Sequence, residues 1–535
     1  MVATRTAGRE GSSIAPDRDS GLTVVPGLPN FWAVLAARLV LFLSACAVAF
    51  YLIDPLPAGQ VGFDAAASVL YFDRLIQGRH LEAFIAATPK PLLTMVYGVV
   101  YHITGDWRPI SWLAITIFGL SAVLAATLAG RLGGLRAAVF AGVAVVSSPS
   151  LIADVGVSYA VVWAFAACLL AGLAITSTPP RYGWAGAALG VAALARFEVL
   201  IILGACAVVL AGASLRARYR GVARPAVRTW LILVGFLAVP IQFAHDWLLT
   251  GNPLLAEQVP SRASIGLALM TPAGAIAYIG YHLLEMGPLL VLAALGALVL
   301  FRNRQWGILI GLTAMAPGVA GFLVFLAARR IYISGRYLDP IELAIIVAAA
   351  VGIGAVGIPD VITAAERVRT RATRLLLQTV SASIVAALLS APFVLLNKPL
   401  LQTLPDNLAI QRDALTALPA LRKAMSAIPG VTNWPGPTDG RLPALFVPTL
   451  LRPQFAVELG LPISQVSGTA AGGLKTDGTY PVAGQIIFHD QRAEPGPAFD
   501  FLEVSAPTTI GRIVITPLLT DPAGGVWVDR IDPAP

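Results

Sequence analysis

Charged residues and cysteines are both scarce in this chain. Only 12% of its 535 side chains are charged and 57% are hydrophobic, whereas a soluble domain has roughly 25% charged residues. Together with a mean hydropathy of +0.77, this excludes a water-soluble globule, because a bilayer requires apolar runs of about 20 residues. The cysteines, Cys46, Cys168 and Cys206, lie in apolar runs and provide neither a disulfide framework nor a CxxC metal site.

Apolar runs recur along most of the chain and predict about eleven membrane spans. The runs cover residues 31–53, 110–128, 135–152, 157–175, 182–195, 197–213, 230–249, 287–301, 306–328, 337–358 and 375–396. Several are short, so the count is approximate. We therefore expect a mainly α, polytopic transmembrane helical bundle.

The net charge of +8 comes from arginines that stand in alternate short loops between the apolar runs. These are Arg131, Arg136, Arg181, Arg216, Arg218, Arg220, Arg224, Arg228, Arg302, Arg304, Arg367, Arg369, Arg371 and Arg374. Positive loops lie on the cytoplasmic side, which places the N-terminus inside and everything after residue 396 outside. This pattern is an orientation signal and argues against nucleic-acid binding. The strong preference for arginine over lysine is typical of a bacterium, so we expect a multi-pass protein of the bacterial plasma membrane.

Three regions follow from this topology. Residues 1–30 form a disordered cytoplasmic tail, residues 31–396 the membrane domain, and residues 397–535 a small extracytoplasmic α+β domain. In the first outer loop, 54–109, we expect interfacial helices over 62–80 and 91–104. In the last region, the pattern predicts a helix over 406–428 and strands over 485–489, 499–504 and 511–516.

Ionisable residues gather at the predicted outer ends of the spans, where they are costly and usually functional. They are Asp64, Asp73, Arg74, Arg79, Lys90, Asp154, Arg196, Glu198, His245, Asp246, Glu285, Arg329, Arg330 and Arg336. An ion-coupled transporter would place such groups near the midplane instead. Lys90, Arg196 and Arg336 are suited to a lipid-linked phosphate, and anchoring to lipid headgroups is the alternative for each.

Short segments in a fixed order support a more specific interpretation. They are Gly62-Phe63-Asp64, Thr88-Pro89-Lys90-Pro91-Leu92, Thr104-Gly105-Asp106, Ser148-Pro149, the run 190–198, Thr250-Gly251-Asn252-Pro253 and Gly335-Arg336-Tyr337-Leu338-Asp339-Pro340. Their order and sidedness resemble the GT-C class of integral-membrane glycosyltransferases, which includes protein O-mannosyltransferases and bacterial lipid A aminoarabinose transferases. The resemblance covers residues 31 to about 396.

The resemblance implies transfer of a sugar from a polyprenyl-phosphate donor to an envelope glycan, lipid or protein acceptor on the outer face, by inverting single displacement. Asp64 matches the family's first-loop catalytic base. The candidate contacts of the donor phosphate are Lys90, Arg196, Arg336 and Tyr337, and the candidate substrate-binding residues are Asp73, Glu198, His245 and Asp246. No cofactor is expected, membrane lipids surround the chain, and the role of the last domain stays open between acceptor binding and gating.

Several alternatives stay open at this point. Asp64 could also cap the helix that follows it, and Asp73, nine residues later, falls on the opposite helix face, about 180° away, which weakens a paired-carboxylate hydrolase. Many GT-C members carry an acidic pair where this chain has Asp64-Ala65; a metal site is therefore not expected, although a divalent metal is not excluded. Lys90 stands where several families have His-Pro-Pro or Lys-Pro-Pro, and it either takes the polar role or snorkels.

Two further function classes compete with transfer chemistry. A lipid or polysaccharide transporter would tolerate substitution of Asp64, and a catalytically degenerate scaffold would tolerate loss of both Asp64 and Arg336. The GxGxxG spelled by Gly352, Gly354 and Gly357 lies in an apolar run without the strand and turn of a dinucleotide site. We expect these glycines to permit close helix packing.

Overall fold

The computed structural model describes most of the chain up to residue 356 and parts of the rest. The described residues are 28–54, 61–81, 85, 87–220, 225–255, 259, 269–331, 333, 335–356, 379–380, 383–389, 391, 394–395, 409–410, 414–419, 421–423, 445–448, 451–468, 485–490, 503, 505–510, 513–521 and 526–533. Most of the predicted tail 1–30, much of the predicted span 375–396 and helix 406–428, and most of the predicted strand 499–504 lie outside them.

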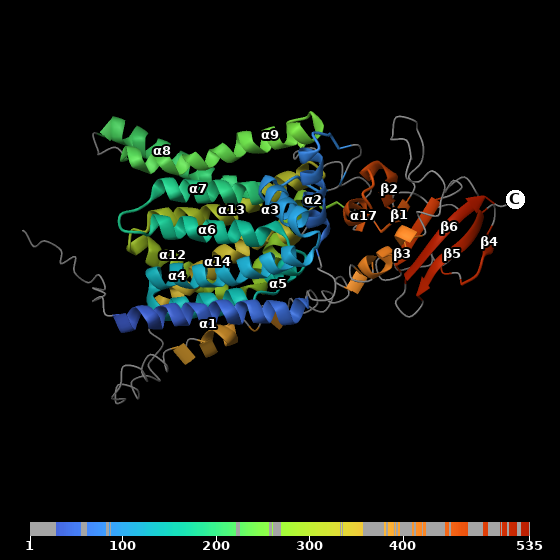
Figure 1. The fold of residues 1–535 in the computed structure, drawn as a ribbon. Helices are drawn as coiled ribbons and strands as arrows, with labels where there is room; N and C mark the ends of the chain where they lie inside the picture. Colours follow the sequence, from blue (N-terminus) through green and yellow to red (C-terminus); the bar gives the residue numbers. More distant parts are fainter. Residues whose placement is uncertain are drawn as a thin grey trace, which may run out of the picture.

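A helical bundle forms the larger part of the structure, with its long helices side by side (Figure 1). Its α-helices are α1 (Leu28–Ile53), α2 (Phe63–Ile76), α3 (Pro91–Thr104), α4 (Arg108–Val146), α5 (Pro149–Gly156), α6 (Ala160–Ile175), α7 (Tyr182–Ala195), α8 (Leu200–Arg220), α9 (Ala238–Thr250), α11 (Pro272–Glu285), α12 (Gly287–Arg302), α13 (Trp306–Ala328) and α14 (Asp339–Ala355). Short 3₁₀ segments, η1 (Phe197–Val199), η2 (Val227–Leu237) and η3 (Gly335–Tyr337), join or extend them.

The long element α4 is a hairpin of two helices. Its chain reverses at Gly134, which has φ 79°, a backbone conformation that glycine adopts readily. A Cβ added at Gly142 would lie 3.7 Å from the Cβ of Ala126, although these residues would be about 24 Å apart along one straight helix. The two runs predicted over 110–128 and 135–152 are thus separate helices packed against each other.

Membrane crossing is supported by length and composition. Among the described residues, five helices are long and apolar enough to cross, or six if α11 and α12, bent by 88°, count as one span. The shorter apolar helices α3, α6 and α7 add to these. Every predicted run up to residue 358 contains a helix, so the chain is a multi-pass membrane protein, and the count of eleven spans stays a prediction.

Helices α2 and α3 lie across one end of the bundle, next to the C-terminal sheet (Figure 1). We call this end the sheet end. Helix α3 has the predicted bounds because Pro91 occupies its first turn and Gly105, with φ 64°, ends it. Helix α2 ends at Ile76, four residues before the predicted His80, because Gly78 has φ 62° and breaks the helix.

The C-terminal region carries helix α17 (Arg452–Leu459), the 3₁₀ turn η7 (Ile463–Gln465) and a six-stranded sheet in the order β2-β1-β3-β6-β5-β4. The strands are β1 (Leu445–Val447), β2 (Val466–Gly468), β3 (Gln485–Asp490), β4 (Thr508–Ile510), β5 (Ile513–Asp521) and β6 (Val526–Pro533). Strand β1 runs parallel to β2 and β3, whereas the pairs β3–β6, β6–β5 and β5–β4 are antiparallel. This confirms the expected α+β composition and the strand predicted over 485–489.

One hydrophobic cluster joins this region to the bundle. It includes Leu70 and Tyr71 of α2, Leu249 of α9, and Phe455 and Phe488 of the C-terminal region. Because these buried side chains form a continuous core, the sheet is held against α2 by packing.

Glycines bring helices of the bundle into close contact, as expected for the GxGxxG segment. A Cβ added at Gly352 would lie 2.1 Å from the carbonyl oxygen of Leu292, and one at Gly354 would lie 2.2 Å from that of Gly133. No side chain fits at such distances, so Gly352 and Gly354 permit α14 to pack against α12 and the α4 turn. Gly357 lies outside the described residues.

Candidate active site

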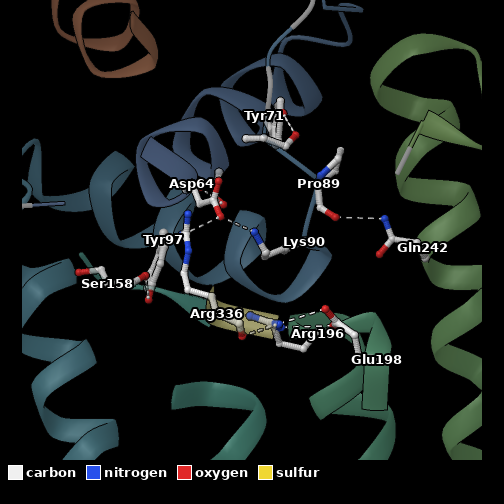
Figure 2. A network of polar contacts seen from close by, with 12 residues as sticks. Asp64, Tyr71, Pro89, Lys90, Tyr97, Ser158, Arg196, Glu198, Gln242 and Arg336 are labelled. Atoms are coloured by element: carbon white, nitrogen blue, oxygen red, sulfur yellow. Dashed lines mark hydrogen bonds and ion pairs between the residues drawn. The ribbon is translucent and has the colours of Figure 1, made fainter. Parts of the chain in front are cut away.

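Asp64 and two cations meet at the sheet end of the bundle (Figure 2). The Lys90 Nζ donates a hydrogen bond of 2.8 Å to Asp64 Oδ2, and Arg336 Nη1 lies 3.9 Å from the same oxygen. The side chains of Asp64 and Lys90 are 16% and 10% exposed, whereas that of Arg336 is 46% exposed. Three elements distant in sequence, α2, the start of α3 and η3, therefore converge on one carboxylate.

The segment before α3 is held so that Lys90 faces Asp64. The carbonyl oxygen of Pro89 accepts a hydrogen bond of 3.2 Å from the buried Gln242 Nε2 of α9. The Tyr71 hydroxyl of α2 donates to the carbonyl oxygen of Ala87 at 2.6 Å. Pro91 opens α3, and a residue before a proline is restricted to an extended backbone. Lys90 accordingly has φ −125° and ψ 98°, which fixes the direction of its Cα–Cβ bond.

Arg196 lies in the break between α7 and η1 and is 3% exposed. Its Nε and Nη2 donate to the two carboxylate oxygens of Glu198 at 3.2 and 3.0 Å, a bidentate pair with fixed orientation. Nη2 also donates to the carbonyl oxygen of Arg336 at 3.2 Å. Arg196 thus neutralises Glu198 and anchors the segment that carries the exposed Arg336 guanidinium.

An aromatic residue that sequence reasoning missed, Tyr159, stands among the cations. Its ring centroid lies 4.9 Å from Lys90 Nζ, 5.4 Å from Arg196 Cζ and 4.3 Å from Arg336 Cζ. The Tyr337 ring lies 5.7 Å from Arg196 Cζ. The sequence analysis considered ionisable groups at the ends of spans and therefore passed over Tyr159. The sequence signal available for this residue was its position directly before the apolar segment of α6.

Asp64 is held in its ionised form. Burial by itself would raise the pKa of the Asp64 carboxyl, but the charges of Lys90, Arg336 and Arg196 and the hydrogen bond from Lys90 bring this pKa below its ordinary value. The carboxylate is therefore charged at neutral pH and able to accept a proton.

Not all predicted site residues join this cluster. Asp64, Lys90, Arg196, Glu198, Arg336 and Tyr337 lie together. Asp73 lies near the other end of α2, where Arg74 and His102 are its charged neighbours. His245 and Asp246 lie on α9 behind Pro89, with His245 Nδ1 3.5 Å from Asp246 Oδ1 and Gln242 Nε2 donating to Asp246 at 2.8 Å. Gln242 thus links Asp246 to the Pro89 carbonyl oxygen beside Lys90, whereas Asp73 lies apart from the cluster.

Buried carboxyl groups lie beneath the cluster. Asp154 and Asp339 are 4% and 5% exposed. Glu342 accepts hydrogen bonds from Ser148 Oγ at 2.6 Å and Ser150 Oγ at 2.5 Å. Of these carboxyl groups, the sequence analysis named Asp154 among the ionisable residues at span ends and Asp339 within the segment 335–340, whereas Glu342 was missed.

An apolar cavity of about 130 Å³ extends from Arg196 and Glu198 into the bundle. Apolar side chains of α6, α7, α8, α13 and α14 line it, among them Phe165, Leu189, Ile202, Met315 and Val347. The cations and the apolar space therefore adjoin at Arg196.

Within the described part of the chain, no three His, Cys, Asp or Glu side chains are placed to hold a metal ion. The positive charges of the cluster are those of the Lys90, Arg196 and Arg336 side chains.

No protein-family model matches the chain, and no curated protein matches it. Among solved structures, the chain is similar to ArnT from Cupriavidus metallidurans in the apo state, at 16% identity and a TM-score of 0.48 over 92% of this chain and 98% of ArnT. Its similarity to ArnT bound to undecaprenyl phosphate is 15% identity and a TM-score of 0.47, over 92% and 97%. The Archaeoglobus fulgidus oligosaccharyltransferase tethered to an acceptor peptide is similar at 12% identity and a TM-score of 0.48, over 80% of this chain and 63% of that one. Such values assign no activity to this chain.

Proposed function

We propose that this protein is a glycosyltransferase of the bacterial plasma membrane that moves a sugar from a polyprenyl-phosphate donor to an extracytoplasmic envelope glycan, lipid or protein. The observation that carries the proposal is the Asp64 carboxylate in contact with Lys90 and near Arg336, at one end of a membrane bundle. The sheet end is then the extracytoplasmic end, in agreement with the arginine loops.

The reaction needs one base and several cations, which is the set of groups present. The acceptor hydroxyl oxygen attacks the anomeric carbon of the sugar, the bond from that carbon to the phosphate oxygen breaks, and Asp64 takes the hydroxyl proton. The phosphate leaves with the bonding electrons, and Lys90, Arg336 and Arg196 offset its negative charge. A single displacement inverts the anomeric centre.

The apolar cavity supports a lipid-linked donor over a soluble one. Arg196 and Glu198 are among its lining residues, so a phosphate at the cations would place the first carbons of an attached chain beside it. A free sugar nucleotide offers nothing apolar to fill such a space. Helices α13 and α14, which line the cavity, would have to admit the rest of the chain from the bilayer.

Donor binding and base activation are coupled in this arrangement. A phosphate at Lys90 and Arg336 competes with Asp64 for the same positive charges. Weaker pairing raises the proton affinity of the carboxylate, so Asp64 becomes a better base when the donor is present.

The proposal is tested in cells that lack the protein and are complemented with wild type, Asp64→Ala or Asp106→Asn. Asp106 pairs with Arg108 in the turn between α3 and α4 and serves as a matched control. Mass spectrometry of polyprenyl-phosphate sugars and envelope glycans should show donor accumulation and loss of one sugar, restored by wild type and Asp106→Asn but not by Asp64→Ala.

An unchanged donor pool in the deletion strain, or full restoration by Asp64→Ala, would overturn the proposal. Restoration by Asp64→Ala together with a transport defect in the deletion strain would favour a lipid or polysaccharide transporter. Restoration by variants of both Asp64 and Arg336 would favour a scaffold.

A further inference from the structure

The ring of Tyr159 holds three cations that otherwise repel one another. Lys90 Nζ, Arg196 Cζ and Arg336 Cζ all lie within 5.4 Å of its centroid, inside the range of about 6 Å at which a cation is attracted to an aromatic face. These cations come from three separate elements: the start of α3, the break after α7, and η3. One side chain thus sets the spacing of charges that no single helix could align.

The backbone fixes this ring in place. Ser158 adopts φ 53°, a left-handed conformation that costs a non-glycine residue energy, and its carbonyl oxygen accepts a hydrogen bond of 3.0 Å from the Tyr97 hydroxyl. The Tyr97 hydroxyl in turn accepts from Trp163 Nε1 at 2.9 Å. The Tyr159 N–H donates to the carbonyl oxygen of Asp154 at 2.8 Å.

The same turn also positions the helix that carries the carboxylate. The Gly62 N–H donates to the carbonyl oxygen of Val157 at 2.9 Å, and a Cβ at Gly62 would lie 2.8 Å from that oxygen. Residue 62 is the N-cap of α2, two residues before Asp64. The ring and the carboxylate are therefore fixed relative to each other through one turn.

An aromatic face differs from a carboxylate in what it leaves available. A carboxylate at the centre of three cations would form ion pairs that an incoming phosphate must break, whereas a ring attracts them more weakly and bears no charge. The ring therefore brings the cations close together without adding a further ion pair to those that Lys90 and Arg336 form with Asp64 and that Arg196 forms with Glu198.

We propose that Tyr159 is a positioning residue that holds Lys90, Arg196 and Arg336 at the spacing of one donor phosphate. This inference rests on the proposed function. It assigns the aromatic ring, and not the hydroxyl group, as the part of Tyr159 that matters.

The test compares Tyr159→Phe, which keeps the ring, with Tyr159→Leu, which removes it, in full-length protein reconstituted in nanodiscs. Phe118→Leu is the matched control, because Phe118 is a fully buried aromatic residue of α4 that lies outside the cluster. Steady-state kinetics with the lipid-linked donor gives KM and kcat, and native mass spectrometry gives the affinity for polyprenyl phosphate alone.

We expect Tyr159→Leu to raise the donor KM and weaken polyprenyl-phosphate binding by about 10- to 100-fold, with a smaller effect on kcat, as loss of several desolvated cation–π contacts implies. Tyr159→Phe should stay within about threefold of wild type, because the ring face remains. Phe118→Leu should leave donor binding unchanged while lowering the unfolding temperature through its cavity.

Each other result is decisive. If Tyr159→Phe is as weak as Tyr159→Leu, the hydroxyl acts and the inference is wrong. If Tyr159→Leu binds polyprenyl phosphate as wild type does, the ring does not set the cation spacing. If wild type neither transfers a sugar nor binds polyprenyl phosphate, it is the proposed function that fails.

Discussion

Replacing Asp64 by asparagine should separate catalysis from donor binding. The amide keeps the size of the side chain but cannot accept a proton from an acceptor hydroxyl, so kcat should fall by about 10²- to 10⁴-fold, the usual loss when a general base is removed. That loss corresponds to about 2.7–5.4 kcal/mol of activation free energy.

Donor binding should respond in the opposite direction. In the unliganded protein, Asp64 occupies Lys90 at 2.8 Å and stands 3.9 Å from Arg336. Asparagine carries no charge and competes less for these cations. Because the Asp64 and Lys90 side chains are only 16% and 10% exposed, loss of the Asp64 charge leaves Lys90 largely buried without this counter-charge, so polyprenyl-phosphate affinity should stay the same or rise.

The assay follows single-turnover transfer from the lipid-linked donor and, separately, binding of polyprenyl phosphate, in wild type, Asp64→Asn and Asp106→Asn. Asp106→Asn should match wild type in both measurements. If Asp64→Asn loses donor affinity in proportion to its rate, then Asp64 serves to hold the cations in place and not as the base. If it turns over at the wild-type rate, the assignment of the base is refuted.

Three further predictions concern pH and domain contact. The cations lower the pKa of Asp64 in the free protein, and a bound donor phosphate would share their charge. Because kcat/KM reports the free enzyme and kcat the enzyme–substrate complex, the acid limb of kcat/KM should lie at lower pH than that of kcat. Acid limbs at the same pH would show that donor and Asp64 do not compete. Glu458 of α17 accepts hydrogen bonds from Tyr101 Oη at 3.0 Å and Trp107 Nε1 at 2.6 Å. Glu458→Ala should therefore weaken docking of the C-terminal region by about 1.5–3 kcal/mol. Hydrogen exchange in α17 should become faster in this variant, and less so in Glu458→Gln. Burial raises the pKa of Asp529 in β6 to about 8, above its unfolded value of about 3.9. Between these two pH values the folded protein binds the proton more tightly than the unfolded chain does. The contribution of Asp529 to stability is therefore greatest below pH 4 and is lost as pH rises towards 8, by at most about 1.4 kcal/mol per pH unit. Thermal unfolding from pH 5 to 8 should show this slope in wild type and a smaller one in Asp529→Asn.

Local structure was largely predictable because short-range chemistry decides it. Helix α3 begins and ends where Pro91 and Gly105 predict, and β3 covers the strand predicted over 485–489. The end of α2 was placed too late because the predicted helix ran through Gly78, whose positive φ stops it.

The geometry of the site was not predictable because it depends on contacts between distant residues. Asp64 and Lys90 are 26 positions apart, and Arg196 and the Arg336 carbonyl are 140 apart. Membrane periodicity identifies which ends of helices share a side but not which ends meet. The sequence therefore predicted which charged residues share one end of the bundle, whereas their pairing required the fold.

Two classes of residue were missed for different physical reasons. Tyr159 carries no charge at neutral pH, so a search for costly ionisable groups passes over it, although its ring contacts three of the cations. Glu458 lies in a helix of eight residues in a Pro- and Gly-rich region. Its importance depends on Tyr101 and Trp107, more than 350 positions earlier.

In the proposed transfer reaction, a single carboxylate would act as the base. Glu198 is occupied by Arg196 in a bidentate pair, whereas Asp64 faces Lys90 and Arg336. A glycoside hydrolase needs a second, protonated carboxyl group for an alkoxide leaving group, but a phosphate leaves as a stable anion when cations surround it.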